Sequence, residues 1–203
     1  MKIGIDIDDV ITNTGEMLIA YAQLFNIEDL DKSSYLEKDK VYTIVNGGAL
    51  ANGCDWTEEQ VIAFKKKYHE YILSNASIKP LAKEIIDRLI NEGHEIHLIT
   101  ARNKASDLID SQKASEELMS KNKINYHKLV TECLDKLPYC KDNNIDIFID
   151  DQLETCKRVA TCGIKVFLMN ALNNVNLDEG EITRVYSWAD IYYQISQLAG
   201  RSR

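Results

Sequence analysis

Residues 2–10 read Lys-Ile-Gly-Ile-Asp-Ile-Asp-Asp-Val, a run in which isoleucines alternate with smaller or polar residues. This period of two predicts a short buried strand that is followed at once by acidic side chains. Similar short apolar runs occur at residues 95–100, 145–149 and 164–168, and a weaker one lies near 125–130. The opening stretch therefore predicts the first strand of a sheet whose other strands come much later in the chain.

The intervals between these runs carry apolar residues at helical spacing. Such stripes lie at residues 81–90, 108–119, 153–160 and 188–198. Glycines follow two of the stripes, at Gly93 and Gly163, where they are typical helix stops. Strands that alternate with helices of this length predict βαβ units. We therefore expect an α/β fold with a doubly wound, parallel, Rossmann-like sheet.

One interval is too long for a single crossover connection. After the first strand the sequence has no further strand pattern until residue 95, but it has two strong helical patterns. One covers residues 17–25, and the other begins with a capping box formed by Thr57 and Gln60. These patterns predict a small helical cap at 15–77, inserted after the first strand. The expected hinges are Thr12–Glu16 and Ser74–Pro80, and the expected α/β core comprises residues 1–14 and 78–203.

The composition excludes several classes of protein. The chain has 203 residues, of which 45% are hydrophobic and 28% charged, and these proportions are typical of a globular protein. A net charge of −8 disfavours binding to a nucleic acid polymer. No apolar run approaches the roughly 18 residues of a membrane span, and the segment Met1–Asp6 does not resemble a signal peptide, so we expect a cytoplasmic protein with no membrane partner.

Cysteine and histidine patterns give no metal or disulfide motif. The five cysteines include no CxxC pair, and an odd number favours free thiols. The four histidines do not form an HExxH motif, and no role is predicted for His69.

Two acidic clusters follow predicted strands directly. Asp6, Asp8 and Asp9 come after the first strand, and Asp150 and Asp151 come after the run at 145–149. Each cluster alone is also typical of an ordinary turn. Carboxylates this close repel one another unless a cation or hydrogen-bond donors compensate them. Because the carboxyl ends of parallel strands share one edge, the two clusters together predict a Mg²⁺ site there.

Two further segments add a hydroxyl and positive charges to the same edge. Thr100-Ala101-Arg102 follows the strand predicted at 95–100, and a hydroxyl next to a guanidinium suits an anionic group. Lys136 precedes an expected helix, and Lys128 and Lys141 are alternatives to it. A nucleophile, a metal and donors for phosphoryl oxygens are what phosphoryl transfer requires.

The order of these motifs resembles the haloacid dehalogenase (HAD) superfamily of phosphohydrolases. The resemblance covers Asp-x-Asp-x-Val at the first strand, a strand-end threonine, a lysine and a late Asp-Asp pair, together with an insert where that superfamily often has a cap. Within the superfamily the chain looks most like the 5′(3′)-deoxyribonucleotidases and related nucleotidases. The small cap, Ile-Thr-Ala-Arg at 99–102 and Asp-Ile-Phe-Ile-Asp-Asp at 146–151 carry this narrower likeness.

The resemblance implies a role for each motif residue. Asp6 would be the nucleophile that forms an aspartyl-phosphate, and Asp8 the acid and then the base. The implied Mg²⁺ ligands are Asp6, Asp8 through its backbone carbonyl, Asp150 and Asp151, with the direct ligand of the last two left open. The implied phosphate-binding residues are Asp9, Thr100, Ala101, Arg102 and Lys136. Asp9 departs from the family pattern, which often has glycine there, although its backbone N–H can still donate to phosphate.

The cap is expected to select the substrate. Its aromatic residues could stack on a flat group or pack between the cap helices. They are Tyr21, Phe25, Tyr35, Tyr42, Trp56, Phe64, Tyr68 and Tyr71. Tyr42 and Trp56 are the candidates for substrate contact, and loops at Asn46–Gly48 and Asn52–Gly53 are expected to border the site.

The sequence therefore favours a Mg²⁺-dependent phosphomonoesterase acting on a small phosphorylated metabolite such as a nucleoside monophosphate. Sugar phosphates are the alternative substrates. A dehalogenase is disfavoured because a halide leaving group needs no acid such as Asp8. A phosphoacceptor receiver domain is disfavoured because its acceptor aspartate precedes its threonine and lysine. A non-catalytic metal-binding protein is a further alternative, and the sequence leaves the oligomeric state open.

Overall fold

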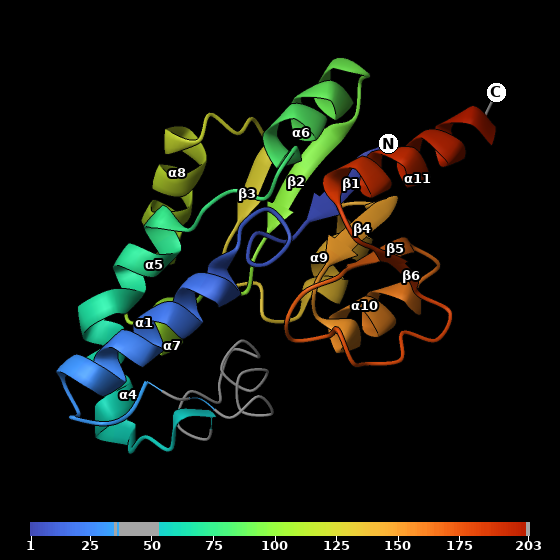
Figure 1. The fold of residues 1–203 in the computed structure, drawn as a ribbon. Coiled ribbons are helices and arrows are strands. Elements are labelled where there is room, and N and C mark those ends of the chain that lie inside the picture. The colour runs from blue at the N-terminus through green and yellow to red at the C-terminus, as the bar shows by residue number, and fades with distance from the viewer. Residues whose placement is uncertain (35, 37–52, 202–203) are drawn as a thin grey trace.

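The computed structural model describes residues 1–34, 36 and 53–201 (Figure 1). Tyr35, Tyr42, the loop Asn46–Gly48 and Asn52 lie outside the described residues, so the structure does not bear on the substrate contact expected of Tyr42.

Six parallel strands form one sheet in the order β3-β2-β1-β4-β5-β6. The strands are β1 (Lys2–Ile5), β2 (Glu95–Ile99), β3 (Lys128–Val130), β4 (Ile147–Asp150), β5 (Lys165–Met169) and β6 (Thr183–Val185). Neighbouring strands on either side of β1 come from later parts of the chain, because one crossover leads to β2 and a later one returns to β4. The predicted parallel α/β sheet is confirmed.

Helices cover both faces of this sheet (Figure 1). They are α6 (Ala82–Asn91), α8 (Ser111–Lys121), α9 (Lys136–Asp142), α10 (Leu153–Ala160) and α11 (Trp188–Arg201), whereas the short helix α7 (Lys104–Asp107) lies away from the sheet. Ile86 of α6 and Trp188 of α11 belong to the same buried cluster as Ile3 and Ile5. On the opposite face, α9 and α10 pack on the other side of β4 and β5 in a second cluster. The fold is therefore doubly wound.

The central strand accepts only a very small residue at one position. A Cβ at Gly4 would lie 2.9 Å from the Ile99 side chain and 3.0 Å from the Phe148 side chain. Gly4 pairs in register with Phe148 of β4 and with His97 of β2. The glycine thus lets large neighbours close over the centre of the sheet, beneath the edge where β1 and β4 end.

A group of helices from residues 14–75 lies to one side of the sheet (Figure 1). These helices are α1 (Thr14–Glu28), α4 (Glu58–Phe64), a π-helical turn η1 (Lys65–His69) and α5 (Glu70–Asn75). They enclose a separate cluster that includes Phe25, Trp56 and Phe64. The division into a core and a cap at 15–77 is an expectation from the sequence that we carry forward as a proposal.

The two chain segments that lead into and out of these helices run side by side. Thr12 and Ile78 form an antiparallel bridge, the Asn13 N–H donates to the Ser77 carbonyl at 2.9 Å, and the Lys79 N–H donates to the Ile11 carbonyl at 2.8 Å. The two predicted hinge segments, Thr12–Glu16 and Ser74–Pro80, are therefore hydrogen-bonded to each other.

The predicted capping box is present at the start of α4. The Gln60 N–H donates to the Thr57 hydroxyl, and the Thr57 N–H donates to the Gln60 side chain. The helix then widens into the π turn η1, which inserts one residue relative to an α-helix. Tyr68 packs on Phe64, as the predicted apolar stripe has it, and the next residue, His69, is also buried. Tyr71, predicted on the same stripe, is 52% exposed.

The structure also bears on the cysteines and on membrane-spanning helices. The described residues include all five cysteines, and none of them forms a disulfide. Among residues 1–34, 36 and 53–201, no helix combines the length and apolar character needed to cross a bilayer.

Candidate active site

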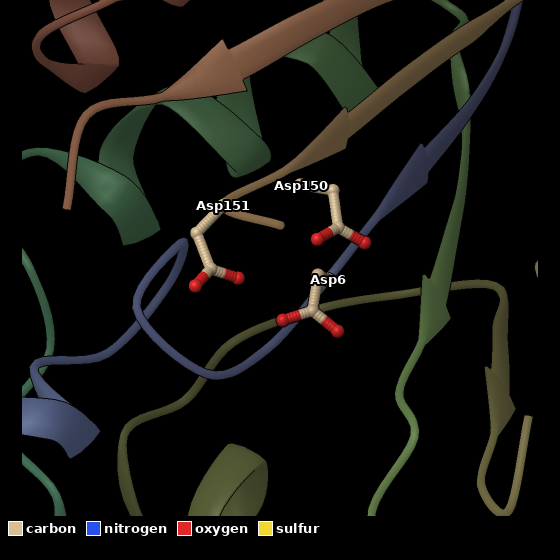
Figure 2. Close-up of side chains that lie close together, drawn as sticks. All are labelled: Asp6, Asp150 and Asp151. Atoms are coloured by element: carbon tan, nitrogen blue, oxygen red, sulfur yellow. The ribbon is translucent and has the colours of Figure 1, made fainter. Parts of the chain in front are cut away.

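The candidate site lies where β1 and β4 end beside each other. Parallel sheets bind ligands at the point where neighbouring strands lead their connections in opposite directions. Ile5 pairs in register with Ile149, and the Asp6 N–H donates to the Ile149 carbonyl at 2.9 Å. The register therefore brings Asp6 next to Asp150 and Asp151 (Figure 2).

Three buried carboxylates converge at this point (Figure 2). One oxygen from each of Asp6, Asp150 and Asp151 lies within 4.8 Å of the others. Their residues are 5%, 0% and 4% exposed, so water screens their repulsion little. Such a cluster needs a compensating cation.

Lys136 supplies part of that compensation. Its Nζ donates to Asp6 and, at 2.7 Å, to Asp150 Oδ2. The lysine begins α9, where Asp135 caps the helix by accepting from the Leu137 N–H. Lys136 is 5% exposed, and the two carboxylates raise its pKa despite burial, which acts in the opposite direction. It is a fixed positive charge between the two strand ends.

The remaining acid groups show that the positive charge is insufficient. Burial raises the pKa of Asp6 to about 7, against the attraction of Lys136. Burial, with repulsion from Asp150, also raises the pKa of Asp151 well above its ordinary value. The raised pKa values of Asp6 and Asp151 mean that these acids tend to hold protons, and a divalent cation bound by their carboxylates would displace those protons.

Asp150 and Asp151 differ in which oxygens are available. Both oxygens of Asp150 are engaged, Oδ2 by Lys136 and Oδ1 by the Gln152 N–H at 2.7 Å. Asp151 uses Oδ2 for the Asn173 amide at 2.6 Å and for Gln152, and no described residue donates to its Oδ1. Asp151 also lines the cavity described below.

Asn173 provides an independent test of whether a metal fits here. Its amide nitrogen donates to Asp151 Oδ2. Its Oδ1 is buried and has no hydrogen-bond partner among the described residues. A buried acceptor left unsatisfied beside a carboxylate cluster suits a hydrated cation, so the residues present fit Mg²⁺.

Asp8 is held by a bidentate ion pair. Arg102 donates from Nε to Asp8 Oδ2 and from Nη2 to Asp8 Oδ1, both at 2.8 Å, and Thr14 donates to Oδ1 at 2.7 Å. Burial favours the neutral acid, but the charge of Arg102 and the hydrogen bonds from Arg102 and Thr14 outweigh it. They hold the pKa of Asp8 below its ordinary value. Arg102, expected from the sequence to bind phosphate, thus binds Asp8 and, at 3.2 Å, the Ser115 hydroxyl.

The backbone of Asp9 has a conformation that glycine adopts most easily. Its φ is 55°, in the left-handed region where glycine is favoured and aspartate is one of the better-tolerated alternatives. Its Oδ1 accepts from the Gly15 N–H at 2.9 Å, in the first turn of α1. The Asp9 carboxylate therefore satisfies a backbone N–H in the first turn of α1. Burial raises the pKa of Asp9 to about 6.

These groups surround a cavity of about 320 Å³. From the core it is lined by Asp6, Asp8, Asp9, Thr100, Ala101, Arg102, Lys136 and Asp151. Thr100 is 1% exposed and directly follows β2, and its hydroxyl accepts from the Arg102 N–H at 3.2 Å. All the site residues that the sequence predicts in the α/β core therefore line this cavity, except Asp150, which contacts the cavity residue Lys136.

Comparisons with known proteins agree with this geometry. No protein-family model matches the chain. A nucleotidase of Clostridium acetobutylicum is 25% identical over 207 residues, covering 100% of this chain and 97% of that protein. A haloacid dehalogenase-like hydrolase of Streptococcus pneumoniae superimposes with a TM-score of 0.70 at 11% identity, over 96% of this chain and 97% of that one. The β-phosphoglucomutase of Clostridium difficile superimposes with a TM-score of 0.64 at 13% sequence identity, over 100% of this chain and 99% of that one.

The chain has the haloacid dehalogenase fold. The resemblance inferred from the motif order is confirmed at this level, since the similarity of the two structures extends over nearly the whole chain.

The cap side of this HAD-fold cavity differs from the expectation. It is lined by Leu18, His69 and Leu73. Trp56 is instead 5% exposed inside the cap, where its indole N–H donates to Asn26 Oδ1 at 2.6 Å and its ring packs on Phe64. The expected contact of Trp56 with substrate is corrected accordingly, because the cap uses this aromatic for its own core.

Sequence reasoning missed two polar residues of the HAD-fold site. Asn173 carried a usable signal, because it follows the predicted strand at 164–168 and so falls on the same sheet edge. His69 carried none, because it lies outside the apolar stripe of Phe64, Tyr68 and Tyr71 that the sequence predicts.

Proposed function

We propose that the chain is a Mg²⁺-dependent phosphomonoesterase that hydrolyses a small phosphorylated metabolite through an aspartyl-phosphate on Asp6. The observation that carries the proposal is the placement of Asp6, its partner Lys136 and the carboxylate of Asp8 around one cavity. A nucleophile, a fixed positive charge and a proton carrier are the parts that phosphoryl transfer needs.

Each residue then has a defined part in the reaction. A carboxylate oxygen of Asp6 attacks phosphorus, the bond from phosphorus to the leaving oxygen breaks, and Asp8 gives that oxygen its proton. Water next attacks the aspartyl-phosphate, Asp8 takes a proton from it, and the bond from Asp6 to phosphorus breaks to release phosphate. Thr100 and Lys136 bind phosphoryl oxygens throughout.

Mg²⁺ would be held by Asp6, Asp151 and the Asp8 backbone carbonyl, and when bound it supplies charge neutralisation for the phosphoryl group. Asp150 would act behind this set, because Lys136 and the Gln152 N–H already occupy its oxygens. This choice between Asp150 and Asp151 is one that the sequence leaves open.

Nucleoside monophosphates are the first substrates to test. The relative from Clostridium acetobutylicum, similar over the whole chain, is named a nucleotidase. Sugar phosphates are the alternative substrates. Dehalogenation is disfavoured because a halide leaving group needs no proton from a residue such as Asp8.

The test is phosphate release from 5′- and 3′-mononucleotides in ribo and deoxy form, sugar phosphates and p-nitrophenyl phosphate, with Mg²⁺ and with EDTA. We expect Mg²⁺-dependent release that Asp6→Asn abolishes and that Asp142→Asn, an exposed aspartate on α9, leaves intact. Release only from sugar phosphates would keep the chemistry and discard the nucleotide. No release from any ester, or full activity of Asp6→Asn, would contradict the proposal.

A further inference from the structure

The π turn in the cap turns His69 toward the catalytic cavity. His69 ends the π turn η1, directly after Tyr68, whose ring packs on Phe64 in the aromatic cluster of the cap. His69 is 8% exposed and lines the cavity together with Asp6 and Asp8. Single π turns within helices are often found at functional sites.

One ring nitrogen of His69 is committed to the core. Nδ1 lies 3.0 Å from the carbonyl oxygen of Asp107, the last residue of α7. A carbonyl can only accept, so Nδ1 carries the proton, and in the neutral ring Nε2 is an acceptor. The described part of the chain offers Nε2 no hydrogen-bond partner, which leaves this nitrogen to a group in the cavity.

The charges that face the ring come from three elements. Asp107 of α7 and Asp8 favour its protonated form, whereas Lys65 of η1 opposes it. Burial is the largest effect and lowers the pKa of His69. The ring is therefore neutral at physiological pH, with the acceptor nitrogen retained.

The rest of the cap surface in the cavity is apolar. The described residues of 15–77 that line the cavity are Gly15, Leu18, His69 and Leu73, so His69 is the polar side chain among them. Thr14, Ser106 and Asp107 line the cavity as well, and the Thr14 hydroxyl already donates to Asp8. The core side of the cavity carries the charged groups that suit a phosphate. The alcohol part of a substrate that extends toward residues 15–77 would therefore meet two leucines and the ring of His69, with Ser106 and Asp107 of α7 lining the same cavity.

We propose that His69 determines specificity by accepting a hydrogen bond, through Nε2, from a hydroxyl group on the alcohol part of the substrate. This inference rests on the phosphomonoesterase activity proposed above and narrows it to phosphate esters of polyhydroxy alcohols. The sugar of a nucleotide and a free sugar phosphate share this chemistry. A site built around such a hydrogen bond discriminates against an analogue that lacks the hydroxyl, because the bound analogue would cover the Nε2 acceptor and leave it unpaired.

Two substitutions separate the nitrogens of the ring. His69→Asn keeps an amide donor near Nδ1 for Asp107 and removes the acceptor, whereas His69→Gln can place an amide oxygen near Nε2. Glu70→Gln, the exposed next residue, is the matched control. Kinetics would be measured on a 2′-deoxynucleoside 5′-monophosphate, its 2′,3′-dideoxy analogue, glucose 6-phosphate and p-nitrophenyl phosphate.

We expect His69→Asn to lower kcat/KM for the hydroxyl-bearing ester by about tenfold, the worth of one hydrogen bond, with the change mainly in KM. It should leave p-nitrophenyl phosphate unchanged, and it should remove the preference for the deoxy over the dideoxy nucleotide. His69→Gln should restore part of that preference. A preference confined to glucose 6-phosphate would identify a free sugar as the source of the hydroxyl.

Equal losses on all four esters would show that His69 is only structural and would overturn the inference, as would an unchanged preference in His69→Asn. Neither result touches the proposed activity, which is read from the wild-type protein on p-nitrophenyl phosphate. Failure of wild type on every ester would instead overturn the activity itself.

Discussion

Asp8 and Arg102 show how one ion pair sets the chemistry of a single residue. An acid that protonates a leaving group works best when its pKa lies near the working pH. Arg102 instead holds the pKa of Asp8 below its ordinary value. The sequence indicates that Arg102 follows β2, but it does not indicate which anion the guanidinium binds. A buried arginine satisfies the nearest geometrically matched carboxylate, and here that is Asp8.

Replacing Arg102 by methionine should therefore shift the pH dependence of turnover. Loss of the positive charge raises the pKa of Asp8, so the limb of the kcat/KM profile that reports Asp8 should move to higher pH. We also expect kcat to fall by at least about tenfold, since general acid–base groups contribute about 10²–10⁴ when correctly positioned. The measurement is a pH–rate profile on p-nitrophenyl phosphate.

Arg88→Met, which changes a surface arginine stacked on Tyr192, is the control for this prediction. Its profile should match that of the wild type. A profile of Arg102→Met that moves to lower pH, or does not move, would contradict the assignment of Asp8 as the proton carrier.

At the scale of elements, periodicity predicts the sheet well. The runs at 2–7 and 95–100 contain β1 and β2, and the runs at 145–149 and 164–168 overlap β4 and β5, each of which ends one residue later, because buried strands need apolar residues on both faces. The edge strand β6 went unpredicted, since Thr183-Arg184-Val185 is short and polar at one exposed margin. Helix α9 was not predicted in full, because it has seven residues and contains Pro138 near its start.

The cap is where a regular period fails. A π turn has no sequence signature that separates it from continued α-helix, so the periodicity predicts the packing of Tyr68 on Phe64 but not the burial of His69. The same limitation affected Trp56, because aromatic residues that could stack on a ligand also fill small cores. Which of the two occurs depends on tertiary packing, here against Phe25 and Phe64.

The aromatic cluster of the cap allows a test of the proposed division at 15–77. Phe64 is fully buried there, and Phe64→Ala should cost about 3–5 kcal/mol of local stability. If the cap is a separate cooperative unit, hydrogen exchange should accelerate in α1 and α4 but not in β4 and β5. Hydrogen-exchange mass spectrometry resolves these segments.

Ile62→Ala, at a residue 45% exposed on the same helix, is the matched control and should leave exchange unchanged. Equal acceleration in the sheet strands would mean that cap and core unfold together, and the boundary would then have no energetic meaning.

For the whole molecule, the distribution of charge matters more than its total. The net charge is −8, and several of the acids are gathered in one water-poor cavity beside the buried cations Lys136 and Arg102. The raised pKa values of Asp6, about 7, and Asp9, about 6, mean that the folded protein holds protons that the unfolded chain releases near 3.8. By linkage, these groups make stability fall as pH rises from about 4 to about 7.

Mg²⁺ should therefore stabilise the protein more at pH 7.5 than at pH 5.5, because it competes with those protons. The quantity to measure is the rise in Tm on adding Mg²⁺ in excess, where 100-fold above Kd corresponds to about 2.7 kcal/mol. Measuring this difference at each pH removes the opposite contributions of Asp8 and His69, whose lowered pKa values make stability fall as pH falls. Asp151→Asn should lose the Mg²⁺ effect and Asp142→Asn should keep it. A rise in Tm that is equal at both pH values, or larger at pH 5.5, would mean that the acids at the sheet edge are not where the cation binds.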